Sequence, residues 1–116
     1  MAVEDINAKK LRTLLTSKNK IEIIDVREPD EYKIIHLKGS KLIPMNELPG
    51  KLNEIDWDNE VVFICRTGAR SKLMADLVAK TGMEVKNLKY GIYECFKDEK
   101  CTDLEILEDE IEGYFR

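Results

Sequence analysis

Residues 61–71 of this 116-residue chain, VVFICRTGARS, contain its strongest strand signal. The first five of these residues are apolar, and such a run is typical of a strand buried on both faces of a parallel sheet. The residues that follow it form an apolar stripe at helical spacing: Leu73, Met74, Leu77 and Val78. Gly82 then fits the C-terminal cap of this helix. A buried strand that leads directly into an amphipathic helix predicts an α/β domain.

Shorter segments on both sides continue the alternation of strand and helix. Asn7 is placed to cap a first helix, residues 21–26 form a second buried strand, and Pro29 fits the start of a short helix. Downstream, residues 85–88 predict another strand, and Gly91 precedes another short helix. This alternation predicts a three-layer α/β fold, with a central parallel β-sheet and helices on both faces.

The tail, residues 98–116, is acidic and strongly periodic. Thr102 and Glu105 have the spacing of a capping box at a helix start. Four apolar residues then share one helical face: Leu104, Leu107, Ile111 and Tyr114. We therefore expect two parts: a domain of residues 1–97 and an added amphipathic C-terminal helix packed on that same domain. Docking of the helix on a partner chain or a second copy is the alternative.

Composition and charge narrow the function classes. The chain has 43% hydrophobic and 36% charged residues with few Gly and Pro, which is a globular composition. A net charge of −4 makes broad binding to nucleic acid or anionic membranes a poor expectation. No apolar run approaches the ~20 residues that span a bilayer, and the N-terminus has no signal-peptide core. We expect a cytoplasmic protein with no nucleic-acid or membrane partner.

The cysteines and the histidine argue against a metal site. Cys65, Cys95 and Cys101 are odd in number, and no pair has C-x-x-C spacing, which disfavours a disulfide scaffold and a zinc ribbon. His36 is the sole histidine, so a multi-histidine site cannot form. No cofactor motif is present either, and we expect neither metal nor cofactor.

Cys65 lies where three physical effects stabilise an anion. Ligands of open α/β sheets bind at the carboxyl ends of strands, and a helix N-terminus presents unpaired N–H groups. Arg66 and Arg70 add positive charge, and Gly68 allows a loop of inward-pointing amides. Together they favour the thiolate form of Cys65. Such a cysteine suits a sulfur carrier, a phosphatase nucleophile or a redox thiol.

Four segments, in order, resemble the motifs of single-domain rhodaneses. Residues 25–32 resemble the opening D-V-R-x-x-x-E-Y/F, and residues 36–44 resemble the next motif, G-H-I-x-G-A with N-I-P. Residues 61–71 are similar to the active-site strand and loop that end in C-R-x-G-x-R-S, and residues 88–92 occupy the place of L-x-G-G-I/M. The resemblance extends from residue 21 to about residue 97 and implies a rhodanese-like fold.

This resemblance implies a thiosulfate sulfurtransferase. Cys65 would take the outer sulfur of thiosulfate or of a persulfide donor, and would pass it to cyanide, a thiol or a protein acceptor. The loop would hold the anionic intermediate through six residues: Arg66, Thr67, Gly68, Ala69, Arg70 and Ser71. Asp25 and Arg27 would support the site as internal scaffold, and a pair between Arg27 and Glu31 is plausible.

Loop length separates the two chemistries of the family that this chain resembles. Its sulfurtransferases have a six-residue loop, counted from the cysteine, and its phosphatases and arsenate reductases have seven. Here Cys65 to Arg70 is six residues, which favours sulfur transfer. The alternatives are a phosphatase or arsenate reductase, and a sulfur-carrier or interaction module that works only with a protein partner.

Three departures from the family pattern lie near the expected site. Ile35 and Tyr90 stand where the family has glycine, and Cys95 stands where it has tryptophan. These changes bear on the acceptor more than on the fold. Cys95 is interpreted as a small buried residue, with a resolving thiol for the Cys65 persulfide as the alternative.

Overall fold

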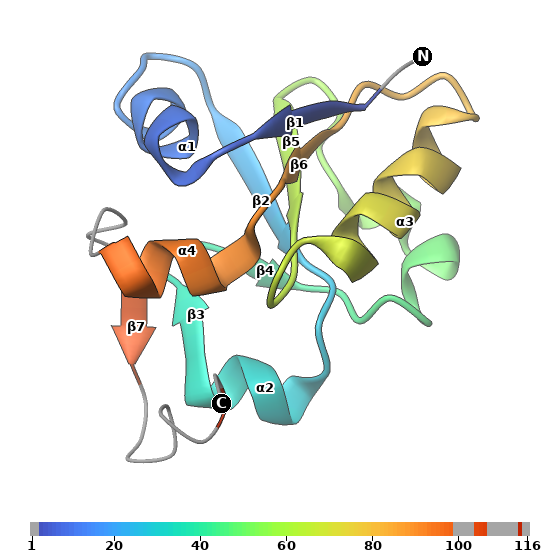
Figure 1. The fold of residues 1–116 in the computed structure, drawn as a ribbon. Coiled ribbons are helices and arrows are strands. Elements are labelled where there is room, and N and C mark those ends of the chain that lie inside the picture. Colours follow the sequence, from blue (N-terminus) through green and yellow to red (C-terminus); the bar gives the residue numbers. More distant parts are fainter. Residues whose placement is uncertain (1–2, 99–103, 107–113, 115–116) are drawn as a thin grey trace.

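The computed structural model describes residues 3–98, 104–106 and 114 (Figure 1). The helices are α1 (Ala8–Leu15), α2 (Pro29–Ile34), α3 (Ala69–Ala79) and α4 (Gly91–Asp98), with 3-10 turns η1 (Leu48–Gly50) and η2 (Leu52–Glu54). The strands are β1 (Glu4–Ile6), β2 (Ile21–Asp25), β3 (Ile35–Leu37), β4 (Lys41–Leu42), β5 (Glu60–Ile64), β6 (Lys86–Leu88) and β7 (Leu104–Ile106). No helix among the described residues is long and apolar enough to cross a bilayer.

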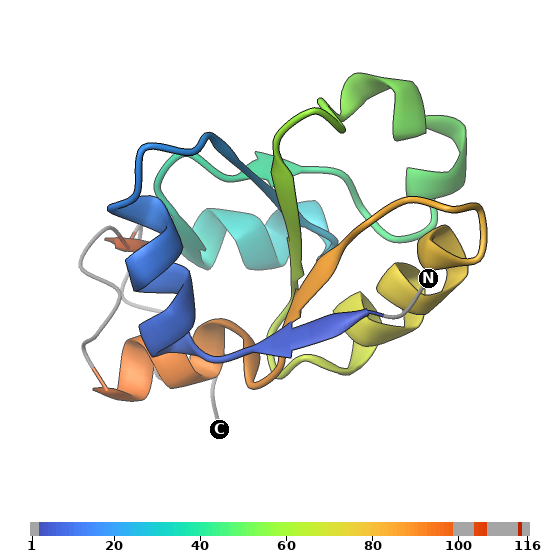
Figure 2. The same ribbon diagram turned by 90° about the horizontal axis from the view of Figure 1, so that it is seen from above.

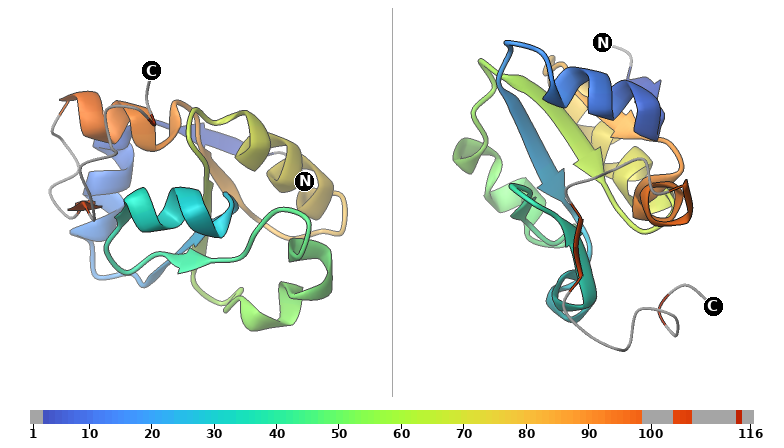
Figure 3. Two further views of the ribbon diagram at one scale, coloured as in Figure 1. Left: turned by 90° about the horizontal axis from the view of Figure 1, so that it is seen from below. Right: turned by 90° about the vertical axis from the view of Figure 1, so that its left-hand side faces the viewer.

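Five strands form the predicted parallel sheet, in the order β1-β6-β5-β2-β4. The β2–β5 register pairs Asp25 with Ile64, so the two strands end side by side. The segment after β2 is thereby brought next to Cys65, which directly follows β5. Figure 3 (left) views the molecule from this side, with α2, α3 and α4 arranged around the ends of the strands.

The strand residues alternate between two apolar cores, one on each face of the sheet. In β5, Val62 and Ile64 belong to the core that α1 and α4 cover, whereas Val61 and Phe63 belong to the core that α3 covers. Figure 2 shows α1 and α3 on opposite sides of the strands. The sheet is therefore buried on both faces, as its uninterrupted apolar run predicts.

Local signals for helix boundaries are confirmed. The Asn7 side chain accepts a hydrogen bond of 2.8 Å from the Lys10 amide at the start of α1, and Pro29 opens α2. Gly82, just beyond α3, has a φ of +93°, the left-handed conformation expected of a C-terminal cap.

The predicted apolar stripe of α3 is partly wrong. Met74 and Val78 are buried, but Leu73 is 52% exposed and Leu77 is 48% exposed. The helix meets the sheet through a face that also contains two buried small residues, Ala75 and Ala79. These small residues let the helix approach the sheet closely, whereas the two leucines remain about half exposed.

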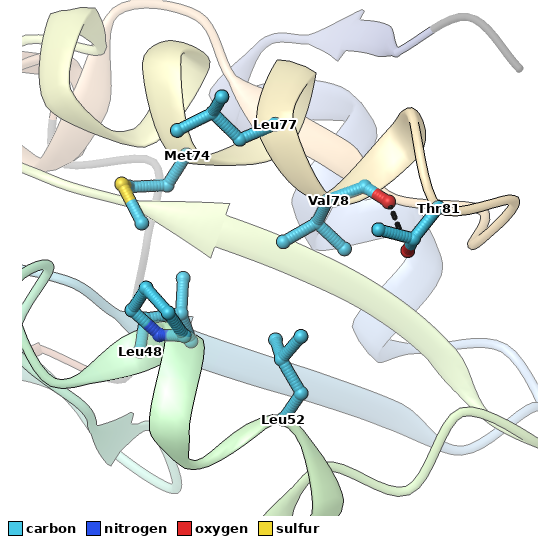
Figure 4. Close-up of a pocket in the computed structure, with 7 residues that line it drawn as sticks. Leu48, Leu52, Met74, Leu77, Val78 and Thr81 are labelled. Atoms are coloured by element: carbon cyan, nitrogen blue, oxygen red, sulfur yellow. Dashed lines mark hydrogen bonds between the residues drawn. The ribbon is translucent and has the colours of Figure 1, made fainter.

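An apolar pocket lies between α3 and the turns η1 and η2 (Figure 4). Its lining residues are Leu48, Pro49, Leu52, Met74, Leu77, Val78 and Thr81. The Thr81 hydroxyl donates a 2.6 Å hydrogen bond to the Val78 carbonyl, so this polar group is already paired within its own helix end. The pocket offers few polar groups to a ligand.

The prediction of a C-terminal helix is wrong at residues 104–106. This segment is strand β7, which pairs antiparallel with β3 in the register Ile35–Ile106 and Leu37–Leu104 (Figure 3, right). The sequence Leu-Glu-Ile alternates with a period of two, and β3 provides backbone groups that a strand can pair with. The other tail residues, apart from Tyr114, lie outside the described residues.

Candidate active site

Cys65 lies at the carboxyl end of β5, directly before the loop that leads into α3. It is 1% exposed, and it is the free cysteine among the described residues. The Gly68 amide donates a 3.0 Å hydrogen bond to Cys65 Sγ, and Ser71 Oγ lies 3.4 Å from the same sulfur. The loop therefore curls around the sulfur and directs N–H and O–H groups toward it.

Two glycines fix this loop against the start of α4. Gly68 has a φ of +101°, and a Cβ there would collide with the Lys89 carbonyl. Gly91 has a φ of +67°, and a Cβ there would collide with the Arg66 carbonyl. Both positions thus require glycine for conformation and for space.

Backbone hydrogen bonds complete this junction. The Ile92 amide donates to the Cys65 carbonyl and the Tyr93 amide donates to the Arg66 carbonyl, each at 3.0 Å. The first amides of α4 are therefore used to hold the loop, and the loop's own amide at Gly68 remains directed at the sulfur.

A buried polar chain supports Ser71 from behind. Ser71 Oγ contacts Asn87 Oδ1 at 2.5 Å, and Asn87 Nδ2 donates to Asp5 Oδ1 at 3.1 Å. The single hydroxyl proton of Ser71 can go to Asn87 Oδ1, to the Gly68 carbonyl or to Cys65 Sγ, so a negative charge on the sulfur would compete for it. Asn87 was not predicted from sequence, because nothing in the local pattern distinguishes it from other strand residues.

Arg70 is engaged in a bidentate ion pair with Glu31 of α2. Its Nη1 and Nη2 atoms donate to the Glu31 carboxylate at 2.8 and 2.9 Å. Partial burial alone would raise the pKa of Glu31, but hydrogen bonds from Arg70 and from the Glu28 amide lower it to about 2. The hydrogen bonds to Glu31 raise the pKa of Arg70 in turn.

The expected pair between Arg27 and Glu31 is wrong at the level of side chains. Arg27 pairs with Asp25 at 2.7 Å, and both side chains are fully buried. Arg27 also donates to the Ile35 carbonyl at 2.6 Å, and it reaches only the main-chain oxygen of Glu31. The Glu31 carboxylate is directed instead toward Arg70, because α2 faces the start of α3 at the ends of β2 and β5.

Arg66 is half-buried and contacts the C-terminal segment. Its Nη1 atom donates a 3.0 Å hydrogen bond to the Tyr114 carbonyl, and its guanidinium lies 5.7 Å from the Tyr114 ring centroid. Tyr114 was expected on a helix face packed on the same domain, but nothing in the sequence identified Arg66 as its partner.

The remaining loop residues lie at the rim. Thr67 and Ala69 are exposed, whereas Gly68 and Ser71 are buried. Cys95 is fully buried and is disulfide-bonded, and since Cys65 is free, the two are not joined. The sequence did not predict this disulfide, and it leaves Cys95 without a free thiol to resolve a Cys65 persulfide. Within the described ranges, no three His, Cys, Asp or Glu side chains gather as a metal site.

Comparisons with known proteins identify relatives of this chain. Residues 7–98 match the rhodanese-like domain family. A "Sulfurtransferase" of Allochromatium vinosum is 31% identical over 91 residues, which are 78% of this chain and 85% of that protein. The "Putative sulfur carrier protein YrkF" of Bacillus subtilis is 30% identical over 83 residues, 72% of this chain but only 45% of YrkF. This chain therefore matches less than half of the length of YrkF.

A solved structure has a similar fold. A rhodanese-related protein from Thermoplasma volcanium aligns with a TM-score of 0.75 and 26% identity, covering 82% of this chain and 92% of that one. The parallel sheet and its flanking helices are thus shared with a rhodanese-related protein over most of both chains.

Proposed function

Because the chain belongs to the rhodanese-like domain family, we propose that it is a sulfurtransferase that carries sulfane sulfur as a persulfide on Cys65. The observation that carries this proposal is the hydrogen bond from the Gly68 amide to Cys65 Sγ, in a loop that two glycines fix in place. A preorganised N–H group stabilises negative charge on sulfur before and after transfer.

The first half-reaction loads the cysteine. The Cys65 thiolate attacks the outer sulfur of thiosulfate, a new S–S bond forms, and sulfite leaves with the electron pair of the broken S–S bond. A persulfide donor reacts in the same way and releases a thiolate. No external oxidant is needed, because the sulfur arrives already at the sulfane level.

The second half-reaction regenerates the enzyme. A cyanide ion or a thiolate attacks the outer sulfur of the persulfide, and Cys65 leaves as the thiolate. The Gly68 amide and the Ser71 hydroxyl stabilise the charge that returns to this sulfur. No side-chain acid or base is required if both nucleophiles react as anions.

A second candidate is sulfur carriage that requires a protein partner. The 1% exposure of Cys65 favours it, because a buried nucleophile needs either a small reagent or a partner that opens the loop. The name of YrkF is consistent with this alternative. Transfer to small thiols would support the enzyme, whereas transfer to a protein acceptor alone would support the carrier.

Steady-state kinetics test the proposal. With thiosulfate and cyanide, we expect the parallel double-reciprocal lines of a ping-pong reaction, and no turnover in Cys65→Ser. The substitution changes little volume, so circular dichroism should confirm that the variant is folded. Activity retained in Cys65→Ser, or hydrolysis of a phosphate ester in place of sulfur transfer, would contradict the proposal.

A further inference from the structure

Tyr114 joins the C-terminal segment to the active-site loop and to two neighbouring segments, the turn after β2 and helix α2. Its hydroxyl accepts a 2.9 Å hydrogen bond from Arg27 Nη1 and donates one of 3.0 Å to Glu31 Oε1. Its ring centroid lies 5.5 Å from the Arg27 guanidinium carbon and 5.7 Å from that of Arg66. Tyr114 therefore has specific contacts at its hydroxyl, its ring and its carbonyl, in a part of the chain beyond the matched residues 7–98.

The two arginines of the loop differ in how their charge is compensated. Arg70 gives two N–H groups to the Glu31 carboxylate, so its positive charge is largely balanced by that partner. Arg66 has no carboxylate partner among the described residues, and its described contacts, with the carbonyl and ring of Tyr114, are to uncharged groups. Among the described residues, Arg66 is therefore the loop arginine whose charge no carboxylate balances.

We propose that Tyr114 is a positioning residue that holds the Arg66 guanidinium for an anionic sulfur donor. This inference rests on the sulfurtransferase function proposed above and assigns a role to a residue outside the loop. A free arginine side chain samples many rotamers, and an anion that binds it must restrict them. The carbonyl and ring of Tyr114 restrict Arg66 beforehand without neutralising it, and other N–H groups of the guanidinium remain for the anion.

The Tyr114 hydroxyl is itself held in place. Arg27 donates to it from a fully buried pair with Asp25, and Glu31 accepts from it while paired to Arg70. Burial raises the pKa of Tyr114 to about 12, so the phenol stays neutral and keeps both hydrogen bonds at neutral pH. The ring that covers Arg66 is thus anchored on the rigid part of the domain.

Alkylation of Cys65 tests this role without relying on sulfur transfer. Iodoacetate and iodoacetamide have similar size and the same leaving group, but only iodoacetate is an anion. The ratio of their second-order rate constants at Cys65, assigned by peptide mapping, therefore reports how well the loop attracts an anion, and differences in access to the buried thiol cancel. The variants are Tyr114→Leu, Tyr114→Phe, Arg66→Gln and the double variant Arg66→Gln with Tyr114→Leu.

The expected pattern isolates the effect of Tyr114 on Arg66. Arg66→Gln should lower the iodoacetate-to-iodoacetamide ratio about fivefold, Tyr114→Leu about threefold, and the double variant no further than Arg66→Gln. Tyr114→Phe removes only the hydroxyl and keeps the ring that Tyr114→Leu removes, so it should retain most of the ratio. Tyr90→Leu is the matched control, because Tyr90 is an exposed tyrosine near the loop whose ring lies against Lys89. It should leave the ratio unchanged.

Kinetics with thiosulfate provide the second measurement. Tyr114→Leu should raise KM for thiosulfate about threefold with little change in kcat, because Cys65 and Gly68 are untouched. An unchanged alkylation ratio in Tyr114→Leu or in Arg66→Gln would overturn the positioning role, even in an active sulfurtransferase. A fall in the ratio in a protein that transfers no sulfur would instead retain the positioning role and overturn the proposed function.

Discussion

Two arginine–carboxylate pairs lie at the ends of neighbouring strands, and they differ mainly in their contact with water. The Arg27–Asp25 side chains are both 0% exposed, whereas those of Arg70 and Glu31 are 34% and 18% exposed. Each arginine makes a bidentate contact with its carboxylate. The two pairs therefore share the same bidentate geometry and differ in how far their side chains are exposed to water.

The buried pair, Arg27–Asp25, supports the fold, whereas the exposed pair, Arg70–Glu31, belongs to the site. Arg27 uses its remaining donors on the Ile35 carbonyl and on Tyr114, so it ties β2, β3 and the C-terminal segment together. Arg70 stands in the first turn of the helix that follows Cys65, and its ion pair brings the Glu31 carboxylate of α2 to that turn. We expect loss of the first pair to affect folding, and loss of the second to affect reactivity with anions.

The largest effect is expected from breaking the buried pair. Arg27→Met should destabilise the domain by about 3–5 kcal/mol, because it leaves the Asp25 carboxylate buried without its cation. Urea unfolding followed by circular dichroism measures this loss. Adding Asp25→Asn to Arg27→Met removes the lone charge and should recover part of the stability. A loss below about 1 kcal/mol in Arg27→Met would show that the pair is not the scaffold described here.

A smaller effect, on activity, is expected from the exposed pair. Arg70→Ala should lower kcat/KM for thiosulfate about tenfold, because a charge-assisted contact is lost and the unpaired Glu31 carboxylate repels the anion. Unfolding in urea should change little by comparison. Glu31→Gln combined with Arg70→Ala removes the repulsion and should restore part of the efficiency. Equal efficiency in Arg70→Ala and the unmodified protein would remove Arg70 from donor binding.

The smallest effect is a pH dependence of stability that comes from Glu31. Its pKa falls from 4.5 to about 2 on folding, so its pairing stabilises the folded state above pH 4.5. This contribution should disappear as the pH is lowered from about 4.5 toward 2. The difference in unfolding free energy between the unmodified protein and Glu31→Gln should therefore shrink over that window. A constant difference across it would mean that the pair contributes nothing to folding.

Most of the fold was predictable from the sequence, because its signals are local. The apolar runs of β2 and β5, the cap at Asn7 and the glycine after α3 each act over a few residues. The strand β7 was not predictable in the same way. Leu104, Glu105 and Ile106 fit a helix or a strand equally well, and pairing with the distant β3 decides between them.

The residues of the active-site loop were predictable from the sequence, but the partners of its two arginines were not. Cys65, Gly68 and Ser71 follow from the motif, and the structure places them together. The partner of Arg70 depends on how α2 faces α3, and the partner of Arg66 depends on where the chain returns after α4. Such contacts join segments far apart in the chain, so no spacing rule identifies them.

A persulfide on Cys65 would add the mass of one sulfur atom, so the intact mass of the purified protein is the decisive measurement. The mass is measured before and after thiosulfate, with Cys65→Ala alongside. We expect the unmodified protein to gain one sulfur atom, to lose it on reduction, and the variant to gain none. A folded, reduced protein that gains no sulfur from thiosulfate or from a persulfide donor, or a Cys65→Ala variant that gains it equally, would contradict the account.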